Sequence, residues 1–457
     1  MSSRRSIVAF PIFMMAILVI VTTSNQSHAQ IAAAGVDVDA KGVLRTKALT
    51  DPTGALTRKR LAEAKAILNK DVARISGLRK ISINRLEAAI QAQRDAGQQL
   101  TEDMMYLAGL TRLSHVFFYP ETGDIVIAGP AEGYGFDISE RAVGIVTGRS
   151  ILQLEDLITA LRAFPPTGDE VGLVSVSIDP TSDGLAKMAQ FLKDLKGVRP
   201  EHDTRIAKGL REHMGLQTVT VRGISPKSHM AQVLVEADYR MKLIGIGLEV
   251  PPVKITNYVD RASARQVASN ALQRWYFTPN YECVRVSKDQ LAMQLVGDGV
   301  KLIGADERVT AAGGRVSVKK TNKASEGFVQ EFTEKYPELA DKVPVYGQLR
   351  NMIDLLVSAA FIRDRDYYAQ ADWDMSLLMD EELISVEYLE APKHVETAVN
   401  VVWKGSTLVT PVGGGVNIQP RKALARELLL KDENGKLSDS REASKIKALP
   451  KNQWWWD

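Results

Sequence analysis

The chain has 457 residues, of which 45% are hydrophobic and 25% are charged, a composition typical of globular proteins. Its formal net charge is +3 and falls to +1 if residues 1–29, which contain two arginines and no acidic residue, are removed. Because nucleic-acid binding draws much of its affinity from a basic excess, this balance argues against a nucleic-acid partner.

The N-terminal residues have the pattern of a secretory signal peptide. Arg4 and Arg5 precede an apolar stretch of 15 residues, Ile7–Val21, and a polar run then leads to Ala29. A helix needs about 20 apolar residues to cross a bilayer. We therefore expect cleavage near Ala29, with a retained anchor as the alternative, and no transmembrane domain in the mature chain. The expected location is the periplasm, the cell envelope or the extracellular space, and the choice between the general and the twin-arginine route stays open.

Hydrophobic periodicity and turn residues predict an α+β or α/β fold built from mixed sheet units. After the signal peptide, 1–29, we expect an N-terminal strand and helical arm over 30–103 and a mixed αβ core over 104–320. A helical subdomain follows over 321–382, then a C-terminal antiparallel β region plus helix over 383–431, in which Gly413 to Gly415 should form a turn. Residues 432–457, rich in Lys, Asp, Ser and Glu, are expected to be a mobile tail.

Two stretches of the core repeat the pattern Ile-x-Pro-x-Ser, and their isoleucines lie 46 residues apart. Each reads as a strand, a turn and a helix whose N-terminus a serine can cap. If the helix N-termini meet the carboxyl ends of neighbouring strands, the adjoining polar residues form one binding edge. The residues of this candidate site are Asp179, Ser182, Ser225, Ser228 and His229. The alternative is that they are ordinary turn and cap residues.

Two further segments have distinct patterns. Glu236 with Arg240, and Asp238 with Lys242, are acid-before-base pairs at i,i+4 and are expected to form a solvated helix face. The aromatic and β-branched run from Trp275 to Val286 surrounds a Pro-Asn turn and is expected to be a buried hairpin.

The sequence contains none of the common motifs of hydrolases, nucleotide-binding proteins or zinc sites. Ser177, Asp179 and His229 are a candidate catalytic set that would lie on the repeated modules. Cys283, the only cysteine, excludes an intramolecular disulfide and is expected to be buried. A calcium loop starting at Asp372 fails, because leucines stand where glycine and glutamate are required. We therefore expect no metal and no cofactor.

The sequence ends in three tryptophans, Trp454, Trp455 and Trp456, followed by Asp457. Exposed aromatic area is unfavourable in water, and tryptophan dominates the energetics of interfaces. These side chains are expected either to clasp a groove of this chain or to dock into an envelope protein partner.

Several strings resemble an uncharacterised family of exported bacterial proteins, domain of unknown function 1598. They are Val235–Lys242 with the glycines after it, Tyr281–Val286, Gln294–Gly304, and Tyr336–Leu339 through Pro344–Arg350. The resemblance spans roughly residues 105 to 420 and implies export and a shared fold, but no activity.

The sequence thus predicts an exported, non-enzymatic envelope protein that binds a partner or another envelope component, or has a structural role. The alternative is a hydrolase of unfamiliar type with its site at the ends of the two Ile-x-Pro-x-Ser strands.

Overall fold

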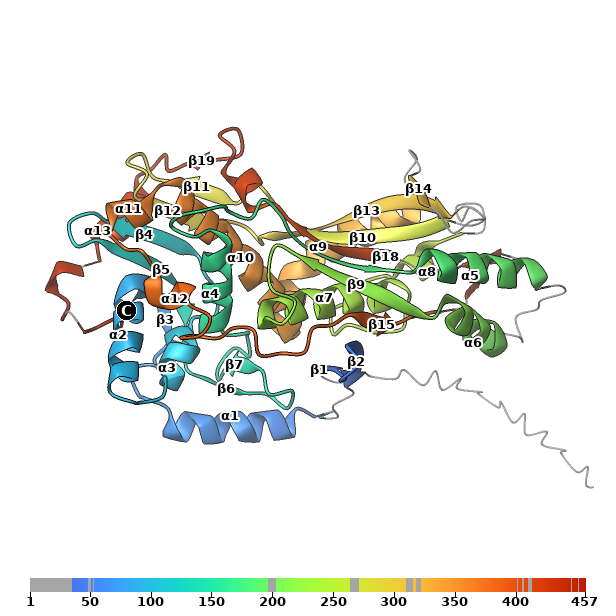
Figure 1. The fold of residues 1–457 in the computed structure, drawn as a ribbon, viewed down its shortest axis with the longest axis horizontal. Coiled ribbons are helices and arrows are strands. Elements are labelled where there is room, and N and C mark those ends of the chain that lie inside the picture. The colour runs from blue at the N-terminus through green and yellow to red at the C-terminus, as the bar shows by residue number, and fades with distance from the viewer. Residues whose placement is uncertain are drawn as a thin grey trace, which may run out of the picture. The chain divides into compact units, whose positions relative to one another are not determined.

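The computed structural model describes residues 35–47, 51, 53–195, 203–263, 271–309, 315–317, 322–400, 402–404, 407–409, 413–444, 446–450 and 452–457 (Figure 1). The predicted signal peptide, residues 1–29, lies outside the described residues.

The larger sheet has nine strands. Neighbouring strands are antiparallel except at two places, where β2 pairs with β15 and β18 pairs with β10 in parallel. Strands β1 and β2 pair antiparallel at one edge of this sheet, in the region where the sequence predicts an N-terminal strand. The strand order is β1 (Gly35–Val38), β2 (Val43–Lys47), β15 (His394–Glu396), β9 (Leu216–Arg222), β8 (Val174–Asp179), β18 (Gly413–Ile418), β10 (Ala271–Pro279), β13 (Val300–Val309) and β14 (Arg315–Ser317).

The second sheet has seven strands, in the order β19 (Leu430–Lys431), β11 (Val284–Val286), β12 (Ala292–Leu295), β4 (His115–Tyr119), β5 (Asp124–Ala131), β3 (Ser76–Ser82) and β20 (Trp455–Trp456). Two small hairpins join β6 (Tyr134–Phe136) with β7 (Ala142–Gly144) and β16 (Val402–Lys404) with β17 (Thr407–Val409). The hairpin predicted over 275–286 is wrong, because β10 and β11 belong to different sheets. The Pro-Asn turn is the place where the chain crosses from one sheet to the other.

The helices confirm the predicted mixed αβ fold class. The helical arm is interrupted by β3, which lies between its two helices. The longer helices are α1 (Ala55–Ile67), α2 (Ile83–Asp95), α4 (Leu154–Ala163), α5 (Ser182–Asp194), α6 (Asp203–Met214), α7 (His229–Gly245), α9 (Lys323–Lys342) and α10 (Pro344–Asp364). The shorter ones are α3 (Glu102–Met105), α8 (Tyr258–Arg261), α11 (Tyr367–Gln370), α12 (Ser376–Met379) and α13 (Lys436–Glu442), with 3-10 turns at Leu107–Gly109, Pro420–Leu424 and Ile446–Ala448.

Helix α10 is the centre of the hydrophobic core. Every residue from Val345 to Ile362 is buried, as expected for a helix enclosed on all sides. Figure 1 shows α10 and α4 between the two sheets. One large cluster of buried side chains extends from Leu44 to Trp454 and includes residues on both sides of the boundaries predicted at 104, 321 and 383. The described residues on the two sides of these boundaries therefore share one buried core.

The glycines predicted to form a turn, Gly413 to Gly415, lie instead in β18, a central strand. A Cβ atom on Gly414 would lie 2.2 Å from the carbonyl oxygen of Trp275 and 3.0 Å from Lys242 Cε. A Cβ atom on Gly415 would lie 2.3 Å from the carbonyl oxygen of Val176. Glycine is required here because the neighbouring backbone, and helix α7 above it, approach β18 closely.

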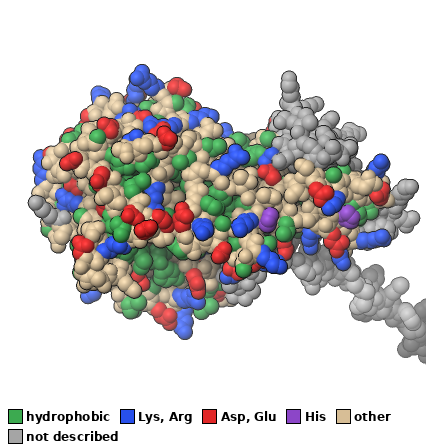
Figure 2. Space-filling view, viewed as in Figure 1, with side chains coloured by type: hydrophobic (Ala, Val, Ile, Leu, Met, Phe, Trp, Pro, Cys, Tyr) green, Lys and Arg blue, Asp and Glu red, His purple; other side chains and the backbone are tan. Residues whose placement is uncertain are grey.

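On the molecular face drawn in Figure 2, acidic and basic side chains are interspersed. Among the described helices, none combines the length and the apolar character needed to span a membrane.

Candidate functional sites

The two repeated modules form as predicted, but they do not share a binding edge. Strands β8 and β9 are antiparallel neighbours, so the carboxyl end of one strand lies beside the amino end of the other. Asp179 ends β8 opposite Thr218, near the start of β9, whereas Ser225 and Ser228 follow the end of β9. The prediction assumed parallel strands, and the single site that it implied is not formed.

The same geometry separates the candidate catalytic set. Asp179 accepts a hydrogen bond from Arg274 (Nη2 to Oδ1, 2.8 Å), while His229 lies beside Asp156. The residues named for a hydrolase therefore do not converge.

The predicted helix caps are confirmed in one of the two modules. Ser228 caps α7 as predicted, because its hydroxyl accepts from the backbone N–H of Ala231. Helix α5 is capped by Thr181 rather than by Ser182, which is the first helical residue.

A groove, hereafter the sheet groove, lies on the face of β10, β13 and β18 that points away from α9. On the opposite face, Trp275 and Phe277 pack against aromatic rings of α9, at centroid distances of 4.4 Å and 5.7 Å. The sheet groove has a volume of about 730 Å³. It is lined by Tyr276, Thr278, Pro279, Asn280, Tyr281, Glu282, Lys301, Ile303, Ala305, Asn417, Gln419, Lys422 and Leu428.

The register of the sheet places these side chains. Tyr276 lies opposite Gly415 of β18 and opposite Ile303 of β13, and its ring packs against the glycine, since a Cβ atom on Gly415 would lie 3.3 Å from Tyr276 Cδ1. Tyr281 is fixed at one end, because its hydroxyl accepts hydrogen bonds from Thr278 Oγ1 (3.2 Å) and from the Gln419 backbone N–H (3.3 Å). Sequence reasoning missed this site, although the alternation from Trp275 to Thr278 would have predicted a strand with one open face.

On the helix side of the sheet, α7 carries a network of buried charges. The two pairs predicted to be solvated are buried: Glu236 and Asp238 are 1% and 0% exposed. Helix α7 is enclosed because β8 and β18 cover one side and α10 covers another. The spacing predicted the pairing, but it contained no information about what packs over the helix.

Each of these buried charges has a charged neighbour. Arg240 Nη2 donates to Glu249 Oε1 at 2.6 Å and its Nη1 donates to Glu236 Oε1 at 3.4 Å. Glu236 also accepts from Arg141. Lys242 Nζ donates to Asp238 Oδ2 at 2.8 Å, and burial raises the pKa of Asp238 to about 6. The compensation of charge within the network indicates a structural role.

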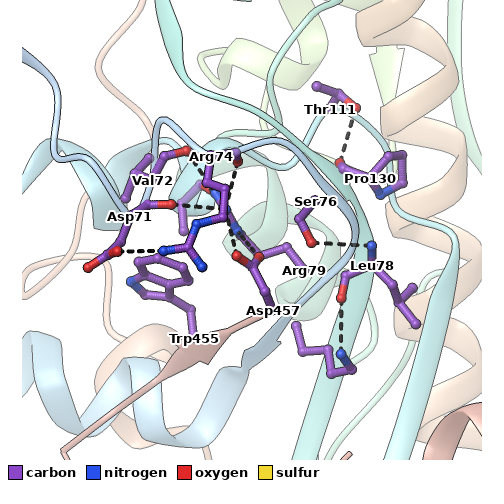
Figure 3. A network of polar contacts seen from close by, with 12 residues as sticks. Asp71, Val72, Arg74, Ser76, Leu78, Arg79, Thr111, Pro130, Trp455 and Asp457 are labelled. Atoms are coloured by element: carbon purple, nitrogen blue, oxygen red, sulfur yellow. Dashed lines mark hydrogen bonds and ion pairs between the residues drawn. The ribbon is translucent and has the colours of Figure 1, made fainter. Parts of the chain in front are cut away.

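The final residues form a clasp on the seven-stranded sheet (Figure 3). Trp455 and Trp456 form β20, which pairs with Ile81 and Lys80 of β3. Trp454 and Trp456 are each 8% exposed. The prediction that 432–457 is mobile is wrong for its described residues. The segment is polar in overall composition, but its tryptophans bury apolar surface against the sheet. The contacts are those of the clasp alternative, while docking to a partner stays a prediction.

Arg79 anchors this clasp, and its side chain is fully buried. Its Nε and Nη2 donate to the two carboxylate oxygens of Asp457, at 2.8 Å and 3.3 Å. Four backbone carbonyls accept its remaining hydrogen bonds: those of Asp71, Val72, Arg74 and Ala108. The Trp455 ring lies over the guanidinium, with its centroid 4.7 Å from Cζ. The N–H groups of the guanidinium therefore have hydrogen-bond acceptors, and one of its faces contacts an aromatic ring.

A fourth cluster joins α4 and α7. His229 Nδ1 lies 3.0 Å from both carboxylate oxygens of Asp156 and 4.0 Å from Glu155 Oε1. Glu155 accepts a hydrogen bond from the Tyr388 hydroxyl. Of these residues the sequence predicted only His229 as a site residue, since an acidic pair in the first turn of a helix is common.

Two remaining expectations concern metals and cysteine. In the described part of the chain, no group of three or more histidine, cysteine, aspartate or glutamate side chains has an arrangement that could hold a metal ion. Cys283 is buried as predicted, and burial raises the pKa of its thiol to about 12, which leaves the thiol protonated and unreactive.

The model of one family, described as Protein of unknown function (DUF1598), matches residues 176–258. Residues 176–258, hereafter the DUF1598 segment, are therefore similar to this family. The resemblance found in the sequence is confirmed over this range, which includes the string Val235–Lys242. No curated protein and no solved structure matches the chain. The DUF1598 segment runs from β8 to Tyr258 and holds most of the α7 charge network and His229, but the sheet groove and the clasp lie outside it.

Within the DUF1598 segment, His229 makes stability depend on pH. Burial lowers the pKa of His229, but the Asp156 carboxylate outweighs this effect and raises the pKa to about 9. A raised histidine pKa stabilises the fold fully below pH 6.5, the ordinary value, and the contribution is lost as pH rises to 9. At about 1.4 kcal/mol per pH unit, the loss is on the order of 3 kcal/mol.

We expect the free energy of unfolding, measured in urea between pH 6.5 and 9, to fall with pH in the natural chain and to stay nearly level in His229→Gln. His213→Gln is the matched control and should retain the fall. If the free energy of unfolding falls equally with pH in the natural chain and in His229→Gln, then His229 does not cause the pH dependence.

Proposed function

We propose that the protein is exported and serves in the cell envelope as a non-enzymatic binding protein, and that the sheet groove holds its ligand. The observation that carries this proposal is the groove itself. Its volume of about 730 Å³ falls in the range of roughly 300–1,000 Å³ typical of ligand sites. It is built largely on paired strands, so the backbone hydrogen bonds of the sheet hold its lining in place. The signal-peptide pattern of the sequence supports the location.

The lining favours a carbohydrate. The ring of Tyr276 is half-buried, with the Arg274 guanidinium over it at 5.1 Å, and its exposed part can contact the C–H face of a sugar. Asn417 and Gln419 contribute side-chain amides, with Gln419 Nε2 donating to Asn417 Oδ1 at 3.2 Å, and the Asn417 N–H groups and the Gln419 carbonyl oxygen can donate to and accept from sugar hydroxyls. Asn417 lies on β18 and Gln419 follows its end, beside β10 at a strand spacing of about 4.8 Å, so that polar groups extend along the groove as an extended chain of rings requires.

The charges of the lining favour an anionic carbohydrate. Lys301 and Lys422 are exposed and contribute two positive charges, against one negative charge from Glu282. A carboxylate on the glycan would lie near these lysines. The buried charges of α7 lie on the other side of the sheet and compensate one another, which supports binding rather than catalysis in the groove.

The proposal is tested by isothermal titration of the full chain with a tetrasaccharide that contains uronic acids, and with its carboxyl-reduced form. We expect the acidic form to bind more tightly than the reduced form. Tyr276→Ala should weaken binding at least tenfold, which is about 1.4 kcal/mol. Lys301→Gln should reduce the preference for the acidic form.

Lys335→Gln is the matched control, because Lys335 is exposed on α9, on the opposite side of the sheet. The proposal would be overturned if Lys301→Gln and Lys335→Gln bound the acidic tetrasaccharide with equal affinity, or if the natural chain bound neither glycan. N-terminal sequencing of the protein from an envelope fraction tests export, and a first residue near Gln30 is expected.

A further inference from the structure

A second cavity, hereafter the α4 pocket, lies beside the His229 cluster and has a volume of about 360 Å³. Its walls are largely apolar and include Ile158 of α4 and Ile384 of the segment that precedes β15. The carboxylate of Glu155 and the side chains of Tyr106 and Tyr388 also line it. The α4 pocket therefore combines apolar walls, two aromatic rings and one carboxylate.

The charges around the α4 pocket do not balance. The three ionisable members of the cluster are His229, Asp156 and Glu155, and His229 is the only cation among them. Both carboxylate oxygens of Asp156 lie 3.0 Å from His229 Nδ1. Glu155 lies farther from the same nitrogen, at 4.0 Å, and its hydrogen-bond donor is the neutral hydroxyl of Tyr388. One imidazolium thus faces two carboxylates, which leaves one negative charge at the pocket.

Nearby charged groups do not remove this excess. Arg141, which also acts electrostatically on His229, forms an ion pair with Glu236, so that this pair adds no net charge. Arg162, farther along α4, is paired with Glu381. The excess negative charge is close to both tyrosines of the pocket, since Glu155 accepts a hydrogen bond from Tyr388 and acts electrostatically on Tyr106.

We propose that the α4 pocket binds an organic monocation, an ammonium group on a short apolar chain, with Glu155 as the counter-ion. The ammonium would lie between the carboxylate and the rings of Tyr106 and Tyr388, which attract cations through their π faces. The apolar chain would contact Ile158 and Ile384. Burial raises the pKa of Glu155, so the charged carboxylate is costly in the empty pocket, and a cation offsets that cost.

This inference does not depend on the sheet groove, and its test uses different ligands. Hexylammonium, 1-hexanol and hexanoate have the same chain and differ in charge. Binding of each to the full chain is followed by the methyl NMR shifts of Ile158 and Ile384. We expect hexylammonium to bind at least tenfold more tightly than 1-hexanol, and hexanoate to bind most weakly.

Glu155→Gln should abolish the preference for the ammonium, so that it binds like the alcohol. Glu382→Gln, which changes an exposed glutamate of the same region, should leave the preference intact. The ligand comparison on the natural chain needs no variant and therefore stands even if Glu155→Gln does not fold. Equal affinities of hexylammonium and 1-hexanol, or an unchanged preference in Glu155→Gln, would overturn the proposal.

Discussion

Replacing Arg79 by methionine is expected to lower the free energy of unfolding by about 3–5 kcal/mol, the cost of breaking a buried charge pair. The side chain is fully buried, and its loss leaves the Asp457 carboxylate and four backbone carbonyls without their donor. Unfolding in urea, monitored by tryptophan fluorescence, measures the change.

Arg74→Met is the matched control for Arg79. Arg74 pairs with Asp71 on the surface, where the side chains are 65% and 69% exposed, and its loss should cost less than about 1 kcal/mol. Similar losses in the two variants would contradict the anchoring role of Arg79.

Deleting Gln453 to Asp457 tests the clasp independently. The deletion removes β20 and leaves β3 as the edge of its sheet, so a substantial fall in melting temperature is expected. Unchanged stability, together with loss of a partner in pull-down experiments, would instead favour docking of the tryptophans to another protein.

The second large effect is expected at Arg240, in the middle of α7. Arg240→Met leaves Glu249 without its arginine and leaves Glu236 with Arg141 alone. Breaking a buried pair in this way should cost about 3–5 kcal/mol in the free energy of unfolding. Urea unfolding again provides the measurement.

A double variant separates the loss of Arg240 from the exposure of its partner. Arg240→Met combined with Glu249→Met removes both charges and should recover part of the stability lost in the single variant. Lys208→Met is the surface control, since Lys208 and its partner Glu212 are mostly exposed. A double variant no more stable than Arg240→Met would contradict a buried pair.

Local features of the fold could be predicted from the sequence. Ser228 caps α7 because a cap needs only the residue and an N–H three positions later. The hairpin of β4 and β5 follows in the same way from two apolar runs and a turn between them. The i,i+4 pairing of Glu236 with Arg240 also depends only on helical geometry.

Features that depend on distant residues could not be predicted. Arg79 and Asp457 are 378 positions apart, and no local pattern links them. The direction of β9 relative to β8 decides whether Asp179 and Ser225 share an edge, and the intervening helix α6 left that direction open. Gly413 to Gly415 have the composition of a turn, and only the close approach of Trp275 and α7 explains why they form a strand.

The most direct test of glycan binding in the sheet groove is a map of the ligand on the protein. With the acidic tetrasaccharide added to the full chain, we expect the largest NMR shift changes at Ile303 and Tyr276, with smaller changes at Ile158 in the α4 pocket. Shift changes confined to the α4 pocket or to the clasp, with Ile303 and Tyr276 unchanged, would contradict binding in the groove.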